Sequence, residues 1–332
     1  MSNTMTDFVA RRLCITGGTG SFGQALVAKL LEEKNHVDEL TVFSRDEYKQ
    51  YRLRRRFREG SYPTMKLVLG DIRDQYALRE ALEGMDTVIH AAALKQNPAG
   101  EENPDEFIKT NVEGTRHLIR AAKEANVKRV LALSTDKAVY PTSAYGASKL
   151  CAEKLLMAAQ EKSNVTRFSV FRLGNLLGSR ASVVPALLET EGLDAGKVSI
   201  THPKMTRFSL TLQESVAYCM QAVNIMQGGE VFVPKMSAYR LQDLVTALLP
   251  QAELQVTSPR ASEKMHELAL SVEEARYGYS FKNFFLICPG PHSNLFWKDR
   301  GEPLSDDFFY SSDHPERLLQ VAELRQMMDS IK

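Results

Sequence analysis

Two residues one helical turn apart could remove a proton from an alcohol. The segment Tyr145-Gly-Ala-Ser-Lys149 places a phenol and an ammonium at positions i and i+4, which share one face of a helix. A free tyrosine has a pKa of about 10, too high for a base at neutral pH, and a nearby fixed cation favours its ionised form. The pair is therefore a candidate base that takes a proton from an alcohol while hydride leaves the same carbon.

A glycine-rich segment near the N-terminus could bind the phosphates of a dinucleotide. It reads Thr-Gly-Gly-Thr-Gly-Ser-Phe-Gly over residues 16–23, between a predicted strand and a predicted helix. Gly17 permits a tight turn, Gly20 lets the backbone approach a pyrophosphate, and Gly23 lets the helix pack on the strand. The predicted cofactor contacts here are Thr16, Gly17, Gly20, Ser21, Phe22 and Gly23.

The residues after the second predicted strand distinguish the two nicotinamide dinucleotides. An NAD site would place a carboxylate there against the ribose 2′-hydroxyl, but the chain has Ser44 and Arg45, with Lys49 one turn further on. A hydroxyl and two cations suit a 2′-phosphate, so the sequence favours NADP, although Asp46 follows directly. Small or polar residues after the third and fourth strands leave room for adenine and ribose, namely Asp71, Ile72, Ala91, Ala92 and Ala93.

These residues must be positioned by the elements between Arg12 and about Leu173, where short apolar runs alternate with longer amphipathic ones. The short runs are too apolar to have a solvated face, which indicates a parallel sheet with helical crossovers. The expected strands are 13–16, 40–43, 67–69, 87–90, 130–133, 168–171 and 231–233, and the expected helices are 21–33, 75–82, 104–125 and 145–160.

The predicted fold class is α/β, a Rossmann doubly wound parallel sheet with a smaller C-terminal substrate-binding lobe. We expect residues 8–177 to form the dinucleotide-binding domain, with a returning segment at about 206–235. Residues 178–205 and 236–332 would form the smaller lobe over the carboxyl edge of the sheet, where open α/β sheets bind ligands.

Composition excludes several classes of protein. The chain has 332 residues, of which 43% are hydrophobic and 25% charged, which is typical of about two compact units and not of disorder. A net charge of +1 gives no global positive field for nucleic acid or acidic membranes. Five arginines between residues 52 and 58 are interpreted as a solvated helical face or a subunit contact, because no aromatic stacking platform accompanies them.

The remaining composition favours a cytoplasmic protein without a metal. No apolar run approaches the roughly 20 residues that span a bilayer, and residues 1–7 are too polar for a secretory signal. The four cysteines lie far apart without ligand spacing, so we interpret them as free thiols, most of them buried, and expect no metal site.

The chain resembles the extended short-chain dehydrogenases/reductases. It is more closely similar to the inverting UDP-N-acetylglucosamine 4,6-dehydratases of polysaccharide and flagellin-sugar biosynthesis, over most of its length and less clearly after about residue 285. The pair Asp136 and Lys137 best distinguishes the inverting dehydratases from related enzymes. The resemblance implies that retaining dehydratases carry Asp-Glu at this position and that plain epimerases lack such a pair. The other segments that carry the resemblance are 16–23, 44–47, 91–95, 109–111, 134–138, 145–149, 174–175, 178–180, 205–208, 228–235 and 263–267.

The resemblance implies a loss of water from a hexose. Once carbon 4 is a ketone, Lys137 could remove the proton on carbon 5 while Asp136 protonates the departing hydroxyl of carbon 6. For Lys137 to be the base, its pKa must be lowered by burial or by neighbouring cations. Thr135 would bind the sugar or steady the reaction centre.

The resemblance also assigns the other ligand contacts. It adds Lys95 and Asn111 to the cofactor site, which also includes Tyr145 and Lys149. Arg207, Arg260 and Lys264 would bind the nucleotide diphosphate, and Glu263 a ribose hydroxyl. The full predicted substrate set is Lys95, Asn175, Ser182, Val183, Thr206, Arg207, Arg260 and Glu263. The partners implied are a nucleotide sugar and further copies of the chain in a homo-oligomer, for which a hexamer is our guess.

Several residues depart from the family pattern around the expected substrate pocket, whereas the cofactor and proton-transfer residues are intact. The reaction type is therefore a firmer prediction than the sugar. Two alternatives stay open: a nucleotide-sugar epimerase or reductase of the same superfamily, and a noncatalytic NADP-sensing scaffold. The departures are Asn97, Tyr140, Thr142, Ser143, Ala181, Ser209, Ala261 and Ser262.

Overall fold

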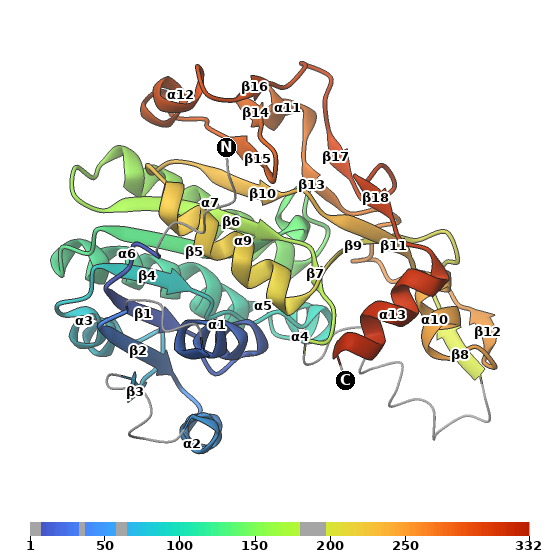
Figure 1. Ribbon diagram of the computed structural model, residues 1–332, viewed down its shortest axis with the longest axis horizontal. Coiled ribbons are helices and arrows are strands. Elements are labelled where there is room, and N and C mark those ends of the chain that lie inside the picture. Colours follow the sequence, from blue (N-terminus) through green and yellow to red (C-terminus); the bar gives the residue numbers. More distant parts are fainter. Residues whose placement is uncertain (1–7, 33–36, 58–64, 180–196, 332) are drawn as a thin grey trace.

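A ten-stranded sheet forms the centre of the molecule (Figure 1). The computed structural model describes residues 8–32, 37–57, 65–179 and 197–331. The strand order is β16-β14-β15-β10-β6-β5-β4-β1-β2-β3. The strands from β10 to β3 run parallel, as the predicted Rossmann fold requires. They are β1 (Arg12–Thr16), β2 (Glu39–Ser44), β3 (Met65–Leu69), β4 (Thr87–His90), β5 (Arg129–Thr135), β6 (Arg167–Leu173) and β10 (Val231–Pro234).

Most of these strands are buried on both faces, which explains their continuous apolar sequences. All four residues of β4 and all but the first residue of β1 are buried. The exception is β3, where Leu69 is 57% exposed. The prediction that no strand has a solvated face is therefore wrong for β3, because that strand lies at the edge of the sheet.

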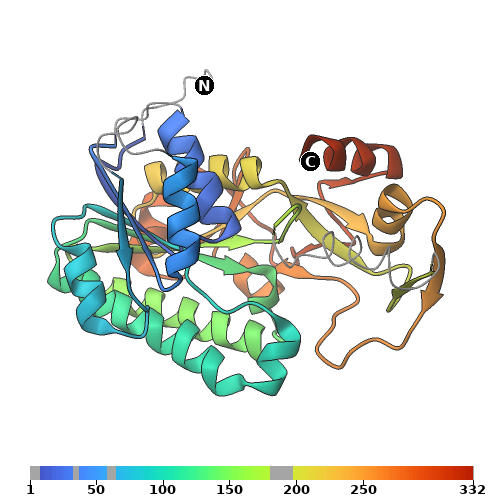
Figure 2. The same ribbon diagram turned by 90° about the horizontal axis from the view of Figure 1, so that it is seen from below.

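Helices cover both faces of the sheet (Figure 2). On one face lie α3 (Gln75–Leu82), α6 (Gly114–Glu124) and α7 (Ala144–Glu161), and on the other lie α1 (Ser21–Glu32) and α9 (Leu212–Ile225). Side chains cap several helix starts: Asp74 accepts from the backbone of α3, and Ser143 accepts from the backbone of Gly146 in α7. The cap at Ser143 places Tyr145 in the first turn of α7.

The predicted helix 104–125 is three helical pieces. They are α5 (Pro104–Phe107), a π-helical turn (Ile108–Glu113) and α6. The π turn contains Asn111, whose side chain bonds both backbone groups of Leu94 and the hydroxyl of Ser148. Such turns are frequent at functional sites, and here one joins the loop after β4 to the helix that carries Tyr145.

The smaller lobe has its own sheets and core beside the carboxyl edge of the main sheet (Figure 1). Its four-stranded sheet consists of β18 (Arg317–Leu318), β11 (Ser237–Arg240), β9 (Thr206–Leu210) and β7 (Asn175–Leu176). A second pair is β12 (Glu253–Val256) with β8 (Lys197–Ile200). The helices α10 (Leu241–Leu248) and α13 (Val321–Ile331) pack around a separate apolar cluster with Tyr239 and Leu324.

The C-terminal segment differs from the predicted division of the chain. Residues 278–303, expected in the lobe, add β14 (Gly278–Ser280), β15 (Phe284–Ile287) and β16 (Glu302–Pro303) to the main sheet. The reason is apolar packing, because Phe284 lies 5.8 Å from Phe232 and 6.5 Å from Phe171 between ring centroids. Conversely, β9 lies in the lobe sheet, although residues 206–235 were expected to return to the dinucleotide domain.

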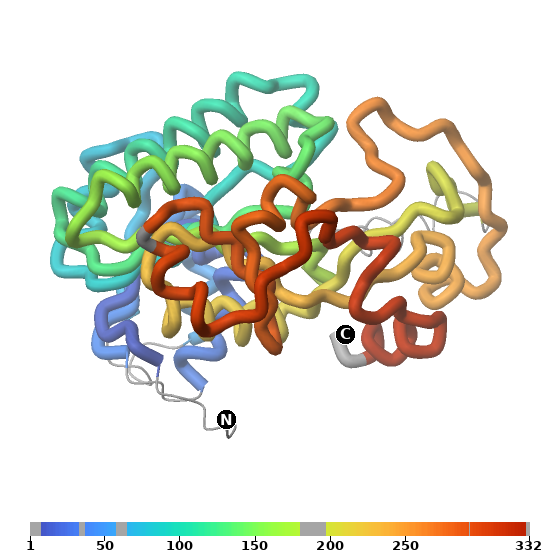
Figure 3. The backbone as a smooth tube through the Cα atoms, turned by 90° about the horizontal axis from the view of Figure 1, so that it is seen from above, coloured from blue at the N-terminus to red at the C-terminus, as the bar shows by residue number. Residues whose placement is uncertain are grey.

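Shorter elements complete the path toward the site. The 3-10 turn Asp136–Ala138 and α4 (Asn97–Glu102) follow β5 and β4, while β13 (Leu268–Leu270) pairs with β17 (Tyr310–Ser311). The remaining helices are α2 (Glu47–Arg56), α11 (Val272–Ala275) and α12 (Pro291–Trp297). The segment between β12 and β13 runs as a long loop that returns toward the start of α7 (Figure 3).

The structure also bears on the composition arguments. The four cysteines are unpaired, and three of them are buried while Cys151 is exposed. In the described parts of the chain, no helix is long and apolar enough to cross a membrane, and no cluster of ligand residues could hold a metal ion. The argument that no aromatic stacking platform accompanies the arginine run is wrong. The exposed rings of Tyr48 and Tyr51, both on α2, stack on each other beside these arginines, with ring centroids 6.5 Å apart.

Candidate active site

The glycine-rich segment forms a tight turn from β1 into α1. Gly17 has a positive φ of 70°, and a Cβ added there would lie 2.6 Å from the backbone nitrogen of Ala92. A Cβ at Gly23 would lie 2.4 Å from the Cα of Gly18. Both positions therefore require glycine, and the turn leaves the N-terminus of α1 directed at a cavity.

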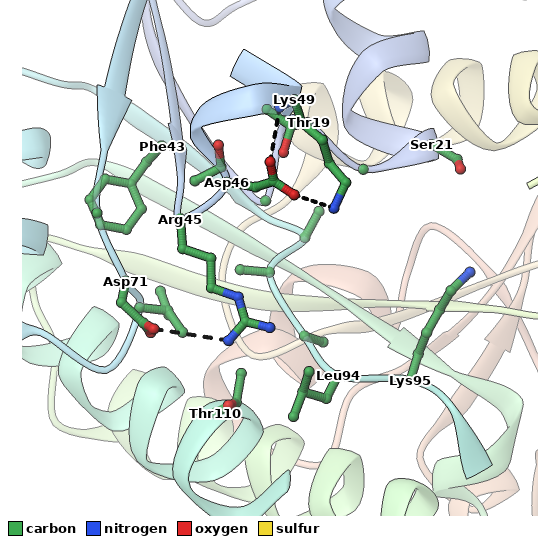
Figure 4. A pocket seen from close by; sticks show the side chains of 18 residues that line it. Thr19, Ser21, Phe43, Arg45, Asp46, Lys49, Asp71, Leu94, Lys95 and Thr110 are labelled. Carbon is green, nitrogen blue, oxygen red and sulfur yellow. Dashed lines mark hydrogen bonds and ion pairs between the residues drawn. The ribbon is translucent and has the colours of Figure 1, made fainter. Parts of the chain in front are cut away.

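A cavity of about 510 Å³ opens along the carboxyl ends of β1, β2 and β4 (Figure 4). Two predicted cofactor residues line neither this cavity nor the second one described below: the hydroxyl of Thr16 lies 2.7 Å from Nδ1 of the buried His90, and Asn111 bonds Leu94 and Ser148. The predicted residues that do line it are Gly17, Gly20, Ser21, Ser44, Arg45, Lys49, Asp71, Ile72, Ala91, Ala92, Ala93 and Lys95.

The carboxylates at the end of β2 and β3 already bind protein groups. Asp46 accepts from the backbone nitrogen of Lys49 at 2.9 Å and pairs with the ammonium of Lys49. Burial raises the pKa of Asp71, but hydrogen bonds from Arg73 outweigh it and lower that pKa. Figure 4 shows Arg45 reaching toward Asp71, 3.9 Å away, with its side chain still 54% exposed.

A second cavity of about 470 Å³ continues from the first past the glycine turn. It brings together residues at the ends of β4, β5 and β6 that are far apart in sequence. The predicted residues in its lining are Gly17, Gly20, Ser21, Phe22, Gly23, Ala91, Ala93, Lys95, Thr135, Lys137, Tyr145, Lys149, Asn175 and Arg260.

Tyr145 and Lys149 lie on the face of α7 that meets this cavity. The ammonium of Lys149 donates a 2.7 Å hydrogen bond to the carbonyl of Leu133, and burial lowers its pKa to about 8. Burial raises the pKa of Tyr145, although the charge of Lys137 and a hydrogen bond from Thr135 act in the opposite direction. The sequence led us to expect that Lys149 would favour the ionised form of the phenol. In the structure the pKa of Tyr145 is raised, and Lys137 is the cation that favours its ionised form.

Asp136, which is buried under the same cavity, forms an ion pair with Lys137, which lines it. Nζ of Lys137 lies 3.0 Å from Oδ1 of Asp136, which also accepts from the hydroxyl of Thr135 at 3.0 Å. Burial raises the pKa of Asp136. Burial alone would lower the pKa of Lys137, but Asp136 and Glu267 outweigh it and raise that pKa. The lowered pKa that a lysine base requires is therefore not found for Lys137.

The predicted substrate residues lie in three environments. Asn175 and Arg260 line the second cavity, whereas Arg207 and Glu263 line a smaller one of about 100 Å³ that shares Lys137 with it. Thr206 faces elsewhere, because its hydroxyl lies 2.7 Å from both His266 and Ser312. Ser182 and Val183 lie outside the described residues, as does Ala181.

Most described departures from the family pattern line the smaller cavity. Asn97, Thr142, Ser143 and Ser262 do so, together with Lys264. The hydroxyl of Thr142 donates to the carbonyl of Ser262 at 3.1 Å, and Lys264 donates to the carbonyl of Val139 at 2.6 Å. The loop before α7 is thereby tied to the segment between β12 and β13.

Sequence reasoning missed one acidic residue at the centre of the site. Glu267 is 3% exposed, and its carboxylate lies 3.2 Å from the ammonium of Lys137. The only sequence signal was its place at the end of the segment Glu-Lys-Met-His-Glu, residues 263–267, which also carries Lys264.

Comparison with known proteins identifies the family. Residues 13–289 match the family described as polysaccharide biosynthesis protein. The chain belongs to this family. It is 38% identical to the inverting UDP-N-acetylglucosamine 4,6-dehydratase of Campylobacter jejuni, over 97% of this chain and 98% of that protein. The predicted resemblance to these dehydratases is confirmed.

Members of the family carry more than one activity in their names. The chain is also 39% identical to a UDP-glucose 4-epimerase of Rickettsia massiliae, over 84% of this chain and 83% of that protein. Among solved structures, Pen from Bacillus thuringiensis superposes with a TM-score of 0.87 at 31% identity, covering 98% of this chain and all of that one. Overall sequence identity does not distinguish a dehydratase from an epimerase, so the choice between them depends on the residues of the site.

Proposed function

We propose that this protein is a UDP-N-acetylglucosamine 4,6-dehydratase that inverts carbon 5 and produces a 4-keto-6-deoxy sugar nucleotide for a surface polysaccharide or glycan. The observation that carries the proposal is the ion pair of the buried Asp136 with Lys137, which lines the cavity that also contains Tyr145. An epimerase needs the tyrosine, but it has no use for an acid and a base that remove water. The nearly full-length match to the Campylobacter jejuni dehydratase supports the same choice.

The first cavity fits a dinucleotide, and we propose that it binds NADP in preference to NAD. The glycine turn leaves backbone where phosphates must approach closely, because a Cβ at Gly17 or Gly23 would clash. A ribose 2′-hydroxyl needs an acceptor, but Asp46 caps α2 and Asp71 binds Arg73. The chemistry that the dinucleotide supplies when bound is reversible hydride transfer.

Tyr145 is the proposed base for the hydroxyl on carbon 4. Its phenol lies in the second cavity, and Lys137 and Thr135 favour the ionised form against burial. Lys149 is fixed on the same helical face by its bond to Leu133. Proton removal from this hydroxyl by Tyr145, together with loss of hydride from carbon 4 to the dinucleotide, would leave carbon 4 as a ketone, which acidifies the proton on carbon 5.

Asp136 and Lys137 can then supply an acid and a base from a single proton. In the ion pair the proton is on Lys137, and moving it along the 3.0 Å contact to Asp136 gives a neutral amine and a neutral acid. The amine takes the proton of carbon 5, the acid protonates the hydroxyl of carbon 6, the carbon–oxygen bond breaks and water leaves a carbon 5–carbon 6 double bond. The hydride taken from carbon 4 would return to carbon 6 and a proton would return to carbon 5, which gives the 4-keto-6-deoxy sugar. No proton is exchanged with solvent before the elimination, and the raised pKa of Asp136 favours the transfer within the pair while the raised pKa of Lys137 opposes it.

The nucleotide part of the substrate is proposed to lie between the main sheet and the lobe. Arg207, Arg260 and Lys264 are the candidate contacts for the diphosphate, and Glu263 is the candidate contact for a ribose hydroxyl. These four residues come from the lobe strand β9 and from the loop between β12 and β13.

The test is incubation of the purified protein with UDP, CDP, GDP and dTDP sugars, followed by mass spectrometry. The proposal expects loss of one water from UDP-N-acetylglucosamine and a C5-inverted 4-keto product by NMR. An isomer of unchanged mass would instead identify the epimerase that the Rickettsia relative names. Cofactor binding without any conversion across the panel would favour the noncatalytic scaffold.

A further inference from the structure

Three acceptors surround the ammonium of Lys137. They are Oδ1 of Asp136 at 3.0 Å, Oδ1 of Asn175 at 3.1 Å and Oε1 of Glu267 at 3.2 Å. An ammonium has three N–H groups and no acceptor, so these contacts can satisfy all of its donors. Lys137 gains the lone pair that a base requires only when one proton moves to a neighbour, and an amide oxygen such as that of Asn175 does not accept it.

The two carboxylates have opposite electrostatic surroundings. Glu267 also faces Arg207 and Lys264, whose nearest nitrogen atoms each lie 3.8 Å from its oxygens. Burial raises the pKa of Glu267, but the three cations outweigh it and lower that pKa. At Asp136 burial prevails and raises the pKa. Neighbouring groups whose pKa values are pushed apart take different roles in proton transfer.

We propose that Glu267 is a positioning residue for the elimination: it stays ionised and holds Nζ of Lys137 at the cavity while Lys137 passes one proton to Asp136. Lys137 then accepts the proton of carbon 5, and Asp136 gives its proton to the departing hydroxyl of carbon 6. This inference rests on the proposed dehydratase function.

The backbone of Glu267 is fixed well enough for this role. Its N–H donates to Oγ of Ser312 at 2.9 Å, and its carbonyl accepts from the N–H of Ser312 at 2.8 Å. The pairing of β13 with β17 continues directly from these bonds. The carboxylate lines the smaller cavity, whereas Asp136 is fully buried.

The charge of Glu267 sets the pH at which the pair of Asp136 and Lys137 holds a single proton. Because a neighbouring anion raises the pKa of both groups, removing this charge lowers both pKa values and makes the one-proton pair available at lower pH. The other charged or titratable groups that face Lys137 or share its cavities are Lys95, Asp136, Tyr145, Lys149, Arg207, Tyr239, Arg260, Glu263 and Lys264. All of them are retained when Glu267 alone is changed.

The test measures exchange of the carbon 5 proton in isolated 4-keto-6-deoxy product, in heavy water, as a function of pH. Glu267→Gln keeps the side chain's shape and removes its charge, so the rising limb of the pH profile should move down by about one to three units. The maximal rate should fall, because Lys137 is held less firmly. Glu267→Asp keeps the charge and should return the limb toward its wild-type position.

Glu273→Gln is the matched control, because it removes an exposed carboxylate six residues further along the chain and should leave the limb unchanged. An unshifted limb in Glu267→Gln, or an equal shift in Glu267→Asp, would overturn the role of the charge. Dinucleotide binding by each variant shows that the fold is intact. If the wild-type protein neither exchanges this proton nor releases water from any sugar nucleotide, the dehydratase function itself fails, and the role falls with it.

Discussion

Lys149 is tied to Leu133 by a 2.7 Å hydrogen bond that joins α7, the helix that carries Tyr145, to the carboxyl end of β5. Thr135, Asp136 and Lys137 begin two residues after Leu133. The bond therefore fixes the distance between the pair on α7, Tyr145 and Lys149, and the pair that follows β5, Asp136 and Lys137. A Cβ at Gly146 would lie 2.3 Å from the carbonyl oxygen of Lys137. The helix and the turn therefore pack in direct contact, and only glycine allows it.

Replacing Tyr145 with Phe should abolish every step of the reaction. The change removes the phenol proposed to take the proton from the hydroxyl on carbon 4 but keeps the ring that packs on Phe107. Single-turnover absorbance should therefore detect no transient reduction of bound cofactor. Cofactor affinity close to that of the wild type would show that the site is intact, and transient reduction at a normal rate would exclude Tyr145 as the base.

Replacing Lys137 with Ala should separate the two halves of the reaction. Hydride can still leave carbon 4, because Tyr145 is present, although more slowly because the phenol loses the cation that favours its ionised form, whereas the proton on carbon 5 has no base. In heavy water the wild-type product should carry deuterium at carbon 5, as NMR or mass spectrometry would measure. Lys137→Ala should show neither deuterium incorporation nor loss of water. Normal incorporation in this variant would favour the epimerase or reductase alternative.

Sequence patterns predicted the elements whose burial is local and regular. The helix 75–82 and the strand 87–90 have the predicted bounds, because a capped amphipathic helix and a strand buried on both faces each have a distinct pattern. Patterns did not predict the π turn, in which the side chain of Asn111 bonds the backbone of Leu94.

The part of the site that sequence reasoning missed depends on distant contacts. Glu267 reaches Lys137 only because β13 pairs with β17, more than forty residues further along the chain. Its three cationic neighbours come from three separate segments. The negative charges of Asp136 and Glu267 raise the pKa of Lys137, opposite to the lowering that a base requires. No periodicity in the sequence reports such a meeting of charges.

Replacing Arg45 with Ala should weaken NADP binding more than NAD binding. Only NADP would lose a charge-assisted contact to the 2′-phosphate, worth about 1.5 to 3 kcal/mol. Arg45 is half exposed and 3.9 Å from Asp71, so its loss should leave the fold unchanged. Titration calorimetry with both cofactors checks the ratio. Equal losses for the two cofactors would exclude Arg45 as the 2′-phosphate contact.

A buried arginine should make a large contribution to stability. Arg172 in β6 is 1% exposed and lies 2.7 Å from a carboxylate oxygen of Glu153 and 3.0 Å from one of Glu274. Arg172→Met leaves Glu153 buried without its cation, which should cost about 3 to 5 kcal/mol in urea unfolding. Adding Glu153→Gln should recover part of the loss. Arg317→Met, at an exposed ion pair with Glu323, should cost no more than about 1 kcal/mol.

The cost of Arg172→Met should also depend on pH. Burial raises the pKa of Glu274, but Arg172 outweighs it and lowers that pKa below its ordinary value of 4.5. A carboxyl with a lowered folded-state pKa stabilises the protein above its unfolded pKa and loses that contribution as pH falls through the folded value. The difference in unfolding free energy between wild type and Arg172→Met should therefore be largest near neutral pH and shrink below about pH 4.5, where the wild type loses this contribution. A difference that stays constant from pH 7 to acid conditions would show that Arg172 acts through packing alone and not through its charge.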